Sequence, residues 1–254
     1  KMNKSVEIDR LSWQEYSKVI KEKVLIIPVG SLDQHGPHLP LGVDAFISYN
    51  MAVRLANNVD GLVAPQIKYG YKSLPASGGG PLFPGTTSLN ASTLVNLMID
   101  VLCEFIDDGA KNIFIMNGHF ENDAFLLEAI DIVINKYEKG TVKICMGSWY
   151  EQLSQETLNV VFDEIPFPGW ALEHAAIAET SVMMHFLPEL VHLDRATEDG
   201  IEVPPTYYTY PVPNDIVPAT GQLHTPRSST PEKGKLMVED ALNVFGSIFK
   251  KEFK

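Results

Sequence analysis

Short apolar runs recur along the chain and alternate with stretches in which apolar residues are spaced for a helix. Residues 23–30 (KVLIIPVG) form a continuous apolar run that ends at a glycine, as is typical of a strand covered on both faces. Similar short runs occupy residues 61–65 (GLVAP), 112–116 (NIFIM) and 141–146 (TVKICM). The pattern therefore predicts four buried strands.

Between these runs, apolar side chains recur at intervals of three and four residues, which marks one face of a helix. In residues 44–59, for example, Ile47, Met51 and Leu55 are each four apart. The same spacing predicts further helices over residues 94–105, 126–133, 150–160, 173–186 and 231–249. Alternating strands and helices favour a three-layer α/β/α sandwich around a mostly parallel sheet. Since the chain contains neither an internal repeat nor a clear linker, we expect residues 1–254 to form a single domain.

Composition narrows the class of protein. The 254 residues are 45% hydrophobic and carry a formal net charge of −12, which fits a folded chain that repels phosphate backbones and anionic lipid. We therefore expect neither nucleic acid nor a membrane as a partner. Two cysteines are too few for a disulfide framework, and the chain lacks an apolar run of the roughly 20 residues that would span a bilayer. These features predict a cytoplasmic protein.

Two long stretches lack any helical or strand pattern. Residues 69–89 are rich in glycine and proline, and residues 200–221 combine five prolines with three tyrosines. Loops of this length in a compact domain are often functional. For residues 200–221 the alternative is an extended arm that packs on its own protein or on a neighbouring subunit. The SGGG sequence in residues 77–80 lacks the lysine of a phosphate-binding loop.

Metal-capable side chains follow two of the predicted strands. Asp33 and His35 come after the first strand, Asp44 opens the following helix, and His119 and Glu121 come after the strand at 112–116. Parallel strands bring their carboxyl ends to the same edge of a sheet. Side chains two residues apart in an extended segment point to the same side, so each segment can present an imidazole and a carboxylate together.

Three carboxylates and two imidazoles form a mixed oxygen and nitrogen set, which suits Zn²⁺ or Mn²⁺ and lacks the thiolates of structural zinc sites. Five ligands fit two ions with one bridging carboxylate and a water between them, an arrangement that activates the water for attack on a carbonyl. Structural roles remain open at this point. Asp44 is also a good helix cap, and Asn117-Gly118 is typical of a turn.

Several longer motifs resemble the creatininase (creatinine amidohydrolase) family over almost the whole chain. They are PVGSLDQHGPHLPLGVD (28–44), YGYKS (69–73), SGGGPLFPGTTSL (77–89), NGHFEN (117–122), GWALEH (169–174), ETS (179–181) and TPEKG (230–234). The resemblance implies the creatininase-like fold, a homohexamer and a binuclear site for Zn²⁺ or Mn²⁺. In that site, one ion is held by Asp33, Asp44 and His119. The other is held by His35, Asp44 and Glu121, so that Asp44 bridges the two ions.

The resemblance also implies a division of roles among other residues. His174 is expected to transfer a proton, and Trp170 to line the substrate pocket. Glu173 beside His174 belongs to the expected site, and the loop at Ser77 is expected to approach the substrate through its backbone. The full expectation is that the catalytic residues are His174, Glu121 and Glu173, and that the substrate-binding residues are Ser77, Gly78, Gly79, Phe120, Tyr150 and Trp170.

Two positions depart from the family pattern. Asp33 stands where the family has glutamate, and the shorter side chain loses one methylene of reach. Tyr150 stands where creatininases have a mobile tryptophan that closes on the substrate, with Trp149 one residue earlier. These departures bear on the substrate more than on the hydrolytic chemistry.

The sequence thus predicts a metal-dependent hydrolase of a small, cyclic, non-peptide amide, with creatinine opened to creatine as the leading reaction. One alternative is a family amidohydrolase with another small substrate, such as a deformylase acting on a flavin or pterin precursor. Another is a non-catalytic, oligomeric binding protein on the same fold.

Overall fold

A four-stranded parallel sheet forms the centre of the molecule. The computed structural model describes residues 5–201, 203 and 206–253. Among these, the strands lie in the order β2-β1-β3-β4, and all neighbouring strands are parallel. Their bounds are Leu25–Val29 (β1), Leu62–Val63 (β2), Asn112–Asn117 (β3) and Lys143–Ser148 (β4). All four predicted strands are therefore confirmed, with ends shifted by at most two residues.

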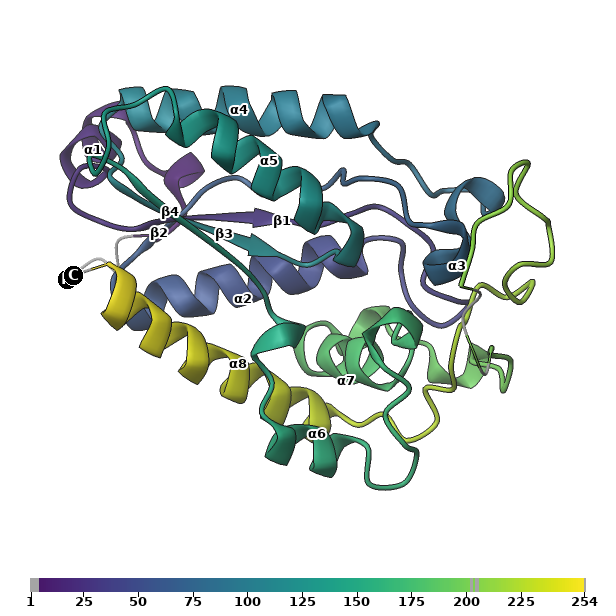
Figure 1. Cartoon of the computed structure of the whole chain (residues 1–254). Coiled ribbons are helices and arrows are strands. Elements are labelled where there is room, and N and C mark those ends of the chain that lie inside the picture. The colour runs from purple at the N-terminus through teal and green to yellow at the C-terminus, as the bar shows by residue number, and fades with distance from the viewer. Residues whose placement is uncertain (1–4, 202, 204–205, 254) are drawn as a thin grey trace.

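Helices cover both faces of this sheet (Figure 1). On one face lie α4 and α5, and on the other lie α2 and α8, with α7 beside them at the carboxyl end of the strands. The helices are α1 (Trp13–Val19), α2 (Val43–Val59), α3 (Pro75–Gly78), α4 (Ala91–Asp107), α5 (Asp123–Ile134), α6 (Gln155–Val161), α7 (Ile177–Phe186) and α8 (Pro231–Glu252). The predicted three-layer α/β/α class is confirmed. That residues 1–254 form one domain stays a prediction.

The two faces of the sheet belong to two apolar cores, because successive strand residues point to opposite sides. Ile26 and Phe114 pack with α2, α7 and α8. Ile27, Ile113 and Ile115 pack with α4 and α5. Both cores are fully buried at these positions, so the strand ends that carry the polar loops are held firmly relative to one another.

Two helix predictions are wrong because they begin four or five residues too early. The helix expected over 150–160 begins at Gln155, after a 3₁₀ turn at Tyr150–Gln152, because the Ser154 side chain caps it by accepting from the N–H of Thr157. The helix expected over 173–186 begins at Ile177. Glu173 and His174 consequently lie in the turn before α7, and this turn faces the sheet edge.

The two irregular stretches differ in the structure. Residues 69–89 contain the short helix α3 and a 3₁₀ turn at Gly80–Leu82. In the other stretch, Val217 is buried with Leu223 and Leu172 in a small third core, whereas Tyr207, Tyr208 and Tyr210 are exposed. Among the described residues, none of the helices combines the length and the apolar character that crossing a bilayer requires.

Candidate metal centre and active site

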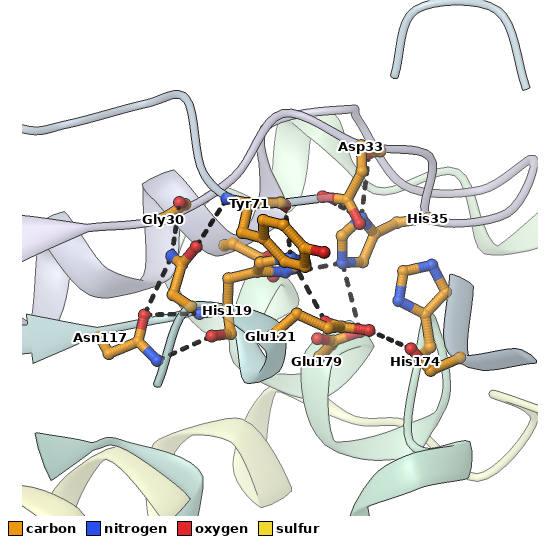
Figure 2. Close-up of polar contacts among 12 residues, drawn as sticks. Gly30, Asp33, His35, Tyr71, Asn117, His119, Glu121, His174 and Glu179 are labelled. Atoms are coloured by element: carbon orange, nitrogen blue, oxygen red, sulfur yellow. Dashed lines mark hydrogen bonds and ion pairs between the residues drawn. The ribbon is translucent and has the colours of Figure 1, made fainter. Parts of the chain in front are cut away.

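The five predicted metal ligands meet at the carboxyl-terminal edge of the sheet. Figure 2 shows Asp33, His35, His119 and Glu121 there. Asp33 and His35 lie on the loop after β1, Asp44 in the first turn of α2, and His119 and Glu121 just after β3. Because β1 and β3 are neighbours paired from Leu25↔Ile113 to Val29↔Asn117, the loops that follow them leave the sheet side by side. The clustering expected from parallel strand ends is therefore present.

The loop after β3 is shaped by its own asparagine and glycine. Asn117 accepts from the N–H of His119 at 3.1 Å and donates to the carbonyl of His119 at 2.7 Å. A Cβ at Gly118 would lie 2.4 Å from the carbonyl oxygen of Asp44, so only glycine permits this approach of the β3 loop to α2. The NG pair thus has a packing function in addition to making a turn.

Asp44 lies between the two histidines and offers one oxygen to each. Its Oδ2 is 2.8 Å from Nδ1 of His119, and its Oδ1 is 3.3 Å from Nε2 of His35. The pKa of Asp44 is held well below its usual range, since the nearby His35 and His119 outweigh the opposing effect of burial. The two oxygens of Asp44 therefore face different histidines, and its expected bridging role stays a prediction.

Asp33 is fully buried, and neither of its carboxylate oxygens has a hydrogen-bond partner. Burial, reinforced by the charge of Asp44, raises the pKa of Asp33 to about 7. A buried carboxylate without a partner is costly unless a cation compensates it. Ligand atoms of Asp33, Asp44 and His119 all lie within 4.8 Å of one another, so the residues present fit a divalent ion.

The histidines show the same excess of negative charge around them. Burial alone would lower the pKa of His119, but the carboxylates of Glu121 and Asp44 raise it to about 10. The pKa of His35 is likewise raised, because Glu179, Asp33 and Asp44 outweigh burial. The carboxylate-rich cluster therefore favours bound positive charge, whether protons or a metal ion.

A second group of close ligand atoms comprises His35, Asp44 and Glu179. Glu179 was not among the expected site residues. Its Oε2 lies 3.5 Å from Nε2 of His35, and it also accepts from the N–H of Ala175 at 2.7 Å. A sequence signal for it existed, since it opens the ETS motif five residues after His174. What brought it to the site is the first turn of α7.

Glu121 is oriented differently from the other carboxylates. Its Oε1 accepts from the N–H of Leu74 at 3.0 Å and from the hydroxyl of Ser77, and its Oε2 lies 3.3 Å from Nε2 of His119. Glu121 therefore links the metal-capable cluster to α3. The expected grouping of Glu121 with His35 and Asp44 stays a prediction.

His174 lies against the cluster, with its ring centroid 4.3 Å from that of His35. Burial, together with the charge of His35, lowers the pKa of His174 to about 4. The ring is consequently neutral at pH 7, and a neutral imidazole can both accept and, once protonated, donate a proton. Its expected proton-transfer role stays a prediction.

Glu173 is buried and uses both carboxylate oxygens on α7. Oε1 accepts from the N–H of Ile177 at 3.1 Å, and Oε2 accepts from the N–H of Ala178 at 3.0 Å. Burial, reinforced by Glu179, raises the pKa of Glu173 to about 8. The side chain also borders the pocket, and its hydrogen bonds hold the N-terminus of α7 in place. Its expected catalytic role stays a prediction.

An aromatic wall closes the pocket beside the cluster. The rings of Tyr150 and Trp170 are 5.2 Å apart, and Phe120 lies 6.4 Å from Tyr150. Of the expected substrate contacts, these three and Ser77 line the pocket together with Glu121, Glu173 and His174. Gly78 and Gly79 are buried next to Ser77 in the chain and are not among the lining residues.

A parallel α/β sandwich that carries a buried carboxylate and histidine cluster beside an aromatic pocket defines a hydrolase of the amidohydrolase class. Comparison with known proteins identifies the family. The family model described as creatinine amidohydrolase matches residues 9–248, nearly the whole chain. The chain belongs to the creatininase family.

Among curated relatives, a creatinine amidohydrolase from Pseudomonas putida is 35% identical over 257 residues, covering 99% of both chains. A 3-dehydro-scyllo-inosose hydrolase from Thermotoga maritima is 29% identical over 189 residues, covering 71% of this chain and 57% of that protein.

Among solved structures, a glutamine variant of creatininase complexed with creatine superposes with a TM-score of 0.94 at 34% identity, covering 98% of this chain and 99% of that one. A zinc–zinc form of a creatininase variant matches with a TM-score of 0.95, and a manganese form of creatininase with 0.94, both at 34% identity and the same coverage.

Proposed function

We propose that this protein hydrolyses creatinine to creatine. The observation that carries the proposal is the buried cluster of Asp33, His35, Asp44 and His119 beside His174 and an aromatic pocket. Ring opening adds one water across the cyclic amide. The water oxygen bonds to the carbonyl carbon, and the carbon–nitrogen bond breaks. One proton of the water ends on the former ring nitrogen and the other on the new carboxyl group. Similarity to the Pseudomonas putida creatinine amidohydrolase supports this substrate.

Two divalent ions, Zn²⁺ or Mn²⁺, are part of the proposal. Asp33, Asp44 and His119 would hold one, while His35, Asp44 and Glu121 would hold the other, with Asp44 shared. When bound, such ions lower the pKa of a coordinated water towards neutrality and polarise the amide carbonyl. The unpartnered oxygens of Asp33 and the zinc–zinc and manganese forms of creatininase support this assignment.

His174 is the proposed proton carrier. Because its ring is neutral at pH 7, it can take a proton from the attacking water and then deliver it to the leaving nitrogen. Its ring lies next to His35 on the pocket side of the cluster. In this scheme Glu121 acts at the cluster, while Glu173 holds the turn that carries His174.

The aromatic wall is the proposed contact for the substrate ring. Creatinine is small and flat, and the faces of Tyr150 and Trp170 offer a matching apolar surface within reach of the cluster. Phe120 borders the same pocket and is half exposed, so it can close the open side. Ser77 of α3 borders the pocket and is a proposed substrate contact. Gly78 ends α3, and Gly79 caps it.

The decisive experiment is turnover of creatinine by protein reconstituted with Zn²⁺ and, separately, with Mn²⁺. The expected result is formation of creatine, followed by proton NMR. No ring opening with either ion overturns the substrate assignment. Metal analysis of the purified protein is the companion measurement, and less than about one tightly bound ion per chain would favour a non-catalytic binding protein.

A hydrolase acting on another small substrate is the second candidate. Tyr150 in the aromatic wall and the relative named as a 3-dehydro-scyllo-inosose hydrolase favour keeping it in the test. A panel that adds formate release from a flavin or pterin formamide precursor separates the two activities. Homohexamer formation and a cytoplasmic location stay predictions, and light scattering after size-exclusion chromatography measures the first.

A further inference from the structure

Gln34 lies between two predicted metal ligands, yet its side chain points away from them and joins three other segments. It is buried on the loop after β1. Its Nε2 donates to the carbonyls of Gly78 and Gly221, each at 2.8 Å, and its Oε1 accepts from the N–H of Gly36 at 2.8 Å. Both amide hydrogens and the amide oxygen are thus used, so the side chain has only one satisfied orientation.

His174 is placed directly against this residue. Its Nε2 lies 2.6 Å from the backbone carbonyl oxygen of Gln34 and 3.1 Å from the Gln34 Nε2. Since Gly78 and Gly221 already take both amide hydrogens, none is left for the imidazole. Nε2 of His174 must therefore be the donor, and the Gln34 carbonyl the acceptor. In a neutral ring this puts the lone pair on Nδ1.

The ring orientation makes that assignment consequential. In Figure 2, one ring nitrogen of His174 faces the side on which His35, Glu121 and Glu179 lie. With Nε2 turned to Gln34, this nitrogen is Nδ1. The nitrogen that can accept a proton is consequently the one directed towards the site.

We propose that Gln34 is a positioning residue that holds His174 in the Nε2–H tautomer with Nδ1 directed into the site. The Gln34 side-chain amide donates to the carbonyls of Gly78 and Gly221. These two hydrogen bonds fix the position of the Gln34 backbone carbonyl, which accepts the hydrogen bond from Nε2–H of His174. This inference rests on the proposed function insofar as His174 is the proton carrier there. Gln34 and Gly221 are 187 residues apart in the chain, so only the fold brings them into contact.

Gly221 provides a way to test the linkage without touching the pocket. A Cβ built there would lie 1.9 Å from Oε1 of Gln34, so Gly221→Ala pushes directly on the amide. Gly140 is a matched control, because its φ of +88° is close to the +78° of Gly221 while nothing lies within 4 Å of its Cβ position. Both alanine variants therefore carry similar backbone strain, and only one displaces Gln34.

Steady-state kinetics with metal-loaded protein should separate the two variants. We expect Gly221→Ala to lower kcat by about tenfold to a hundredfold, as small misplacements of catalytic groups do, with KM and metal content close to wild type. Gly140→Ala should leave kcat unchanged. In Gln34→Ser the shorter side chain removes the collision, so adding Gly221→Ala to it should cause no further loss. Equal losses in Gly221→Ala and Gly140→Ala, or full additivity, would overturn the proposal.

The tautomer itself can be measured without any substrate. In zinc-loaded, ¹⁵N-labelled protein, with the His174 signals assigned by their loss in His174→Gln, Nε2 should show the shift of a protonated nitrogen and Nδ1 that of an unprotonated one. Protonation on Nδ1 would contradict the inference whatever the substrate is. Conversely, if the wild type fails to open creatinine, the proposed function fails while this measurement still decides the role of Gln34.

Discussion

Asp33 and Glu173 are two buried carboxylates near the site. Burial raises the pKa of both, but their hydrogen-bond partners differ. The pKa of Asp33 is raised to about 7 and that of Glu173 to about 8, in both cases chiefly by burial. The two carboxylate oxygens of Glu173 accept hydrogen bonds from two backbone N–H groups of α7. Asp33 has no hydrogen-bond partner for either oxygen.

This difference in hydrogen bonding suits Glu173 to a structural role and Asp33 to the role of a metal ligand. Glu173 is already compensated by the protein, so its removal should loosen the turn that carries His174. The oxygens of Asp33 lack hydrogen-bond donors, and Nδ1 of His35 lies 3.9 Å from Oδ1, so removal of this carboxylate should affect metal binding and leave the metal-free fold intact. The raised pKa values alone would not have distinguished the two carboxylates.

The largest expected effect comes from removing the carboxylate between the two histidines. Asp44→Asn should abolish metal binding and reduce activity to background, because one residue serves both proposed ion positions. Metal analysis and turnover are measured together. Asp60→Asn is the control, since Asp60 follows the last turn of the same helix, is exposed, and pairs with Lys23 on the surface. Retained metal in Asp44→Asn would contradict the shared-ligand assignment.

His174 should affect turnover without affecting the metal. We expect His174→Gln to lower kcat by about 10²–10⁴, the usual contribution of a proton-transfer group, with a metal content equal to wild type. The measurement is steady-state turnover paired with metal analysis of the same sample. Parallel loss of metal and activity would remove His174 from the proton-carrier role.

The two carboxylates should respond in opposite ways in the metal-free protein. Glu173→Gln should lower the free energy of unfolding by about 1–3 kcal/mol, because glutamine offers one acceptor oxygen where Glu173 offers two, and one buried N–H group of α7 loses its partner. Asp33→Asn should leave that free energy equal or higher, and should weaken metal affinity by about tenfold or more. Urea unfolding of EDTA-treated protein and metal titration provide the two readouts. A destabilised metal-free Asp33→Asn variant would contradict the contrast.

The smallest effect is a dependence of metal-free stability on pH. The pKa of Asp33 is about 7 in the folded protein against an ordinary value of 3.8, so between these values the folded state binds more protons than the unfolded state. Stability contributed by protonated Asp33 is therefore present below about pH 4 and lost as pH rises through 7. Asp33→Asn should flatten this part of the curve, measured by urea midpoints across pH.

Much of the fold and half of the site follow from local patterns. The four apolar runs became β1 to β4, and the strand ends brought Asp33, His35 and His119 together because parallel neighbours share an edge. The starts of α6 and α7 were misplaced, since caps such as Ser154 and Glu173 act on backbone groups and leave no apolar period to detect.

The sequence by itself determined the strands, the alternation with helices, and which polar residues follow the two central strands, because apolar periodicity and strand direction are local properties. Only the tertiary structure decided that Glu179 reaches His35 and that Gln34 meets Gly221. These contacts join segments that are far apart in the sequence and that meet only because α7 and the loop at Gly221 pack against the sheet edge. Their side-chain partners are set by that packing, which no spacing within a single segment encodes.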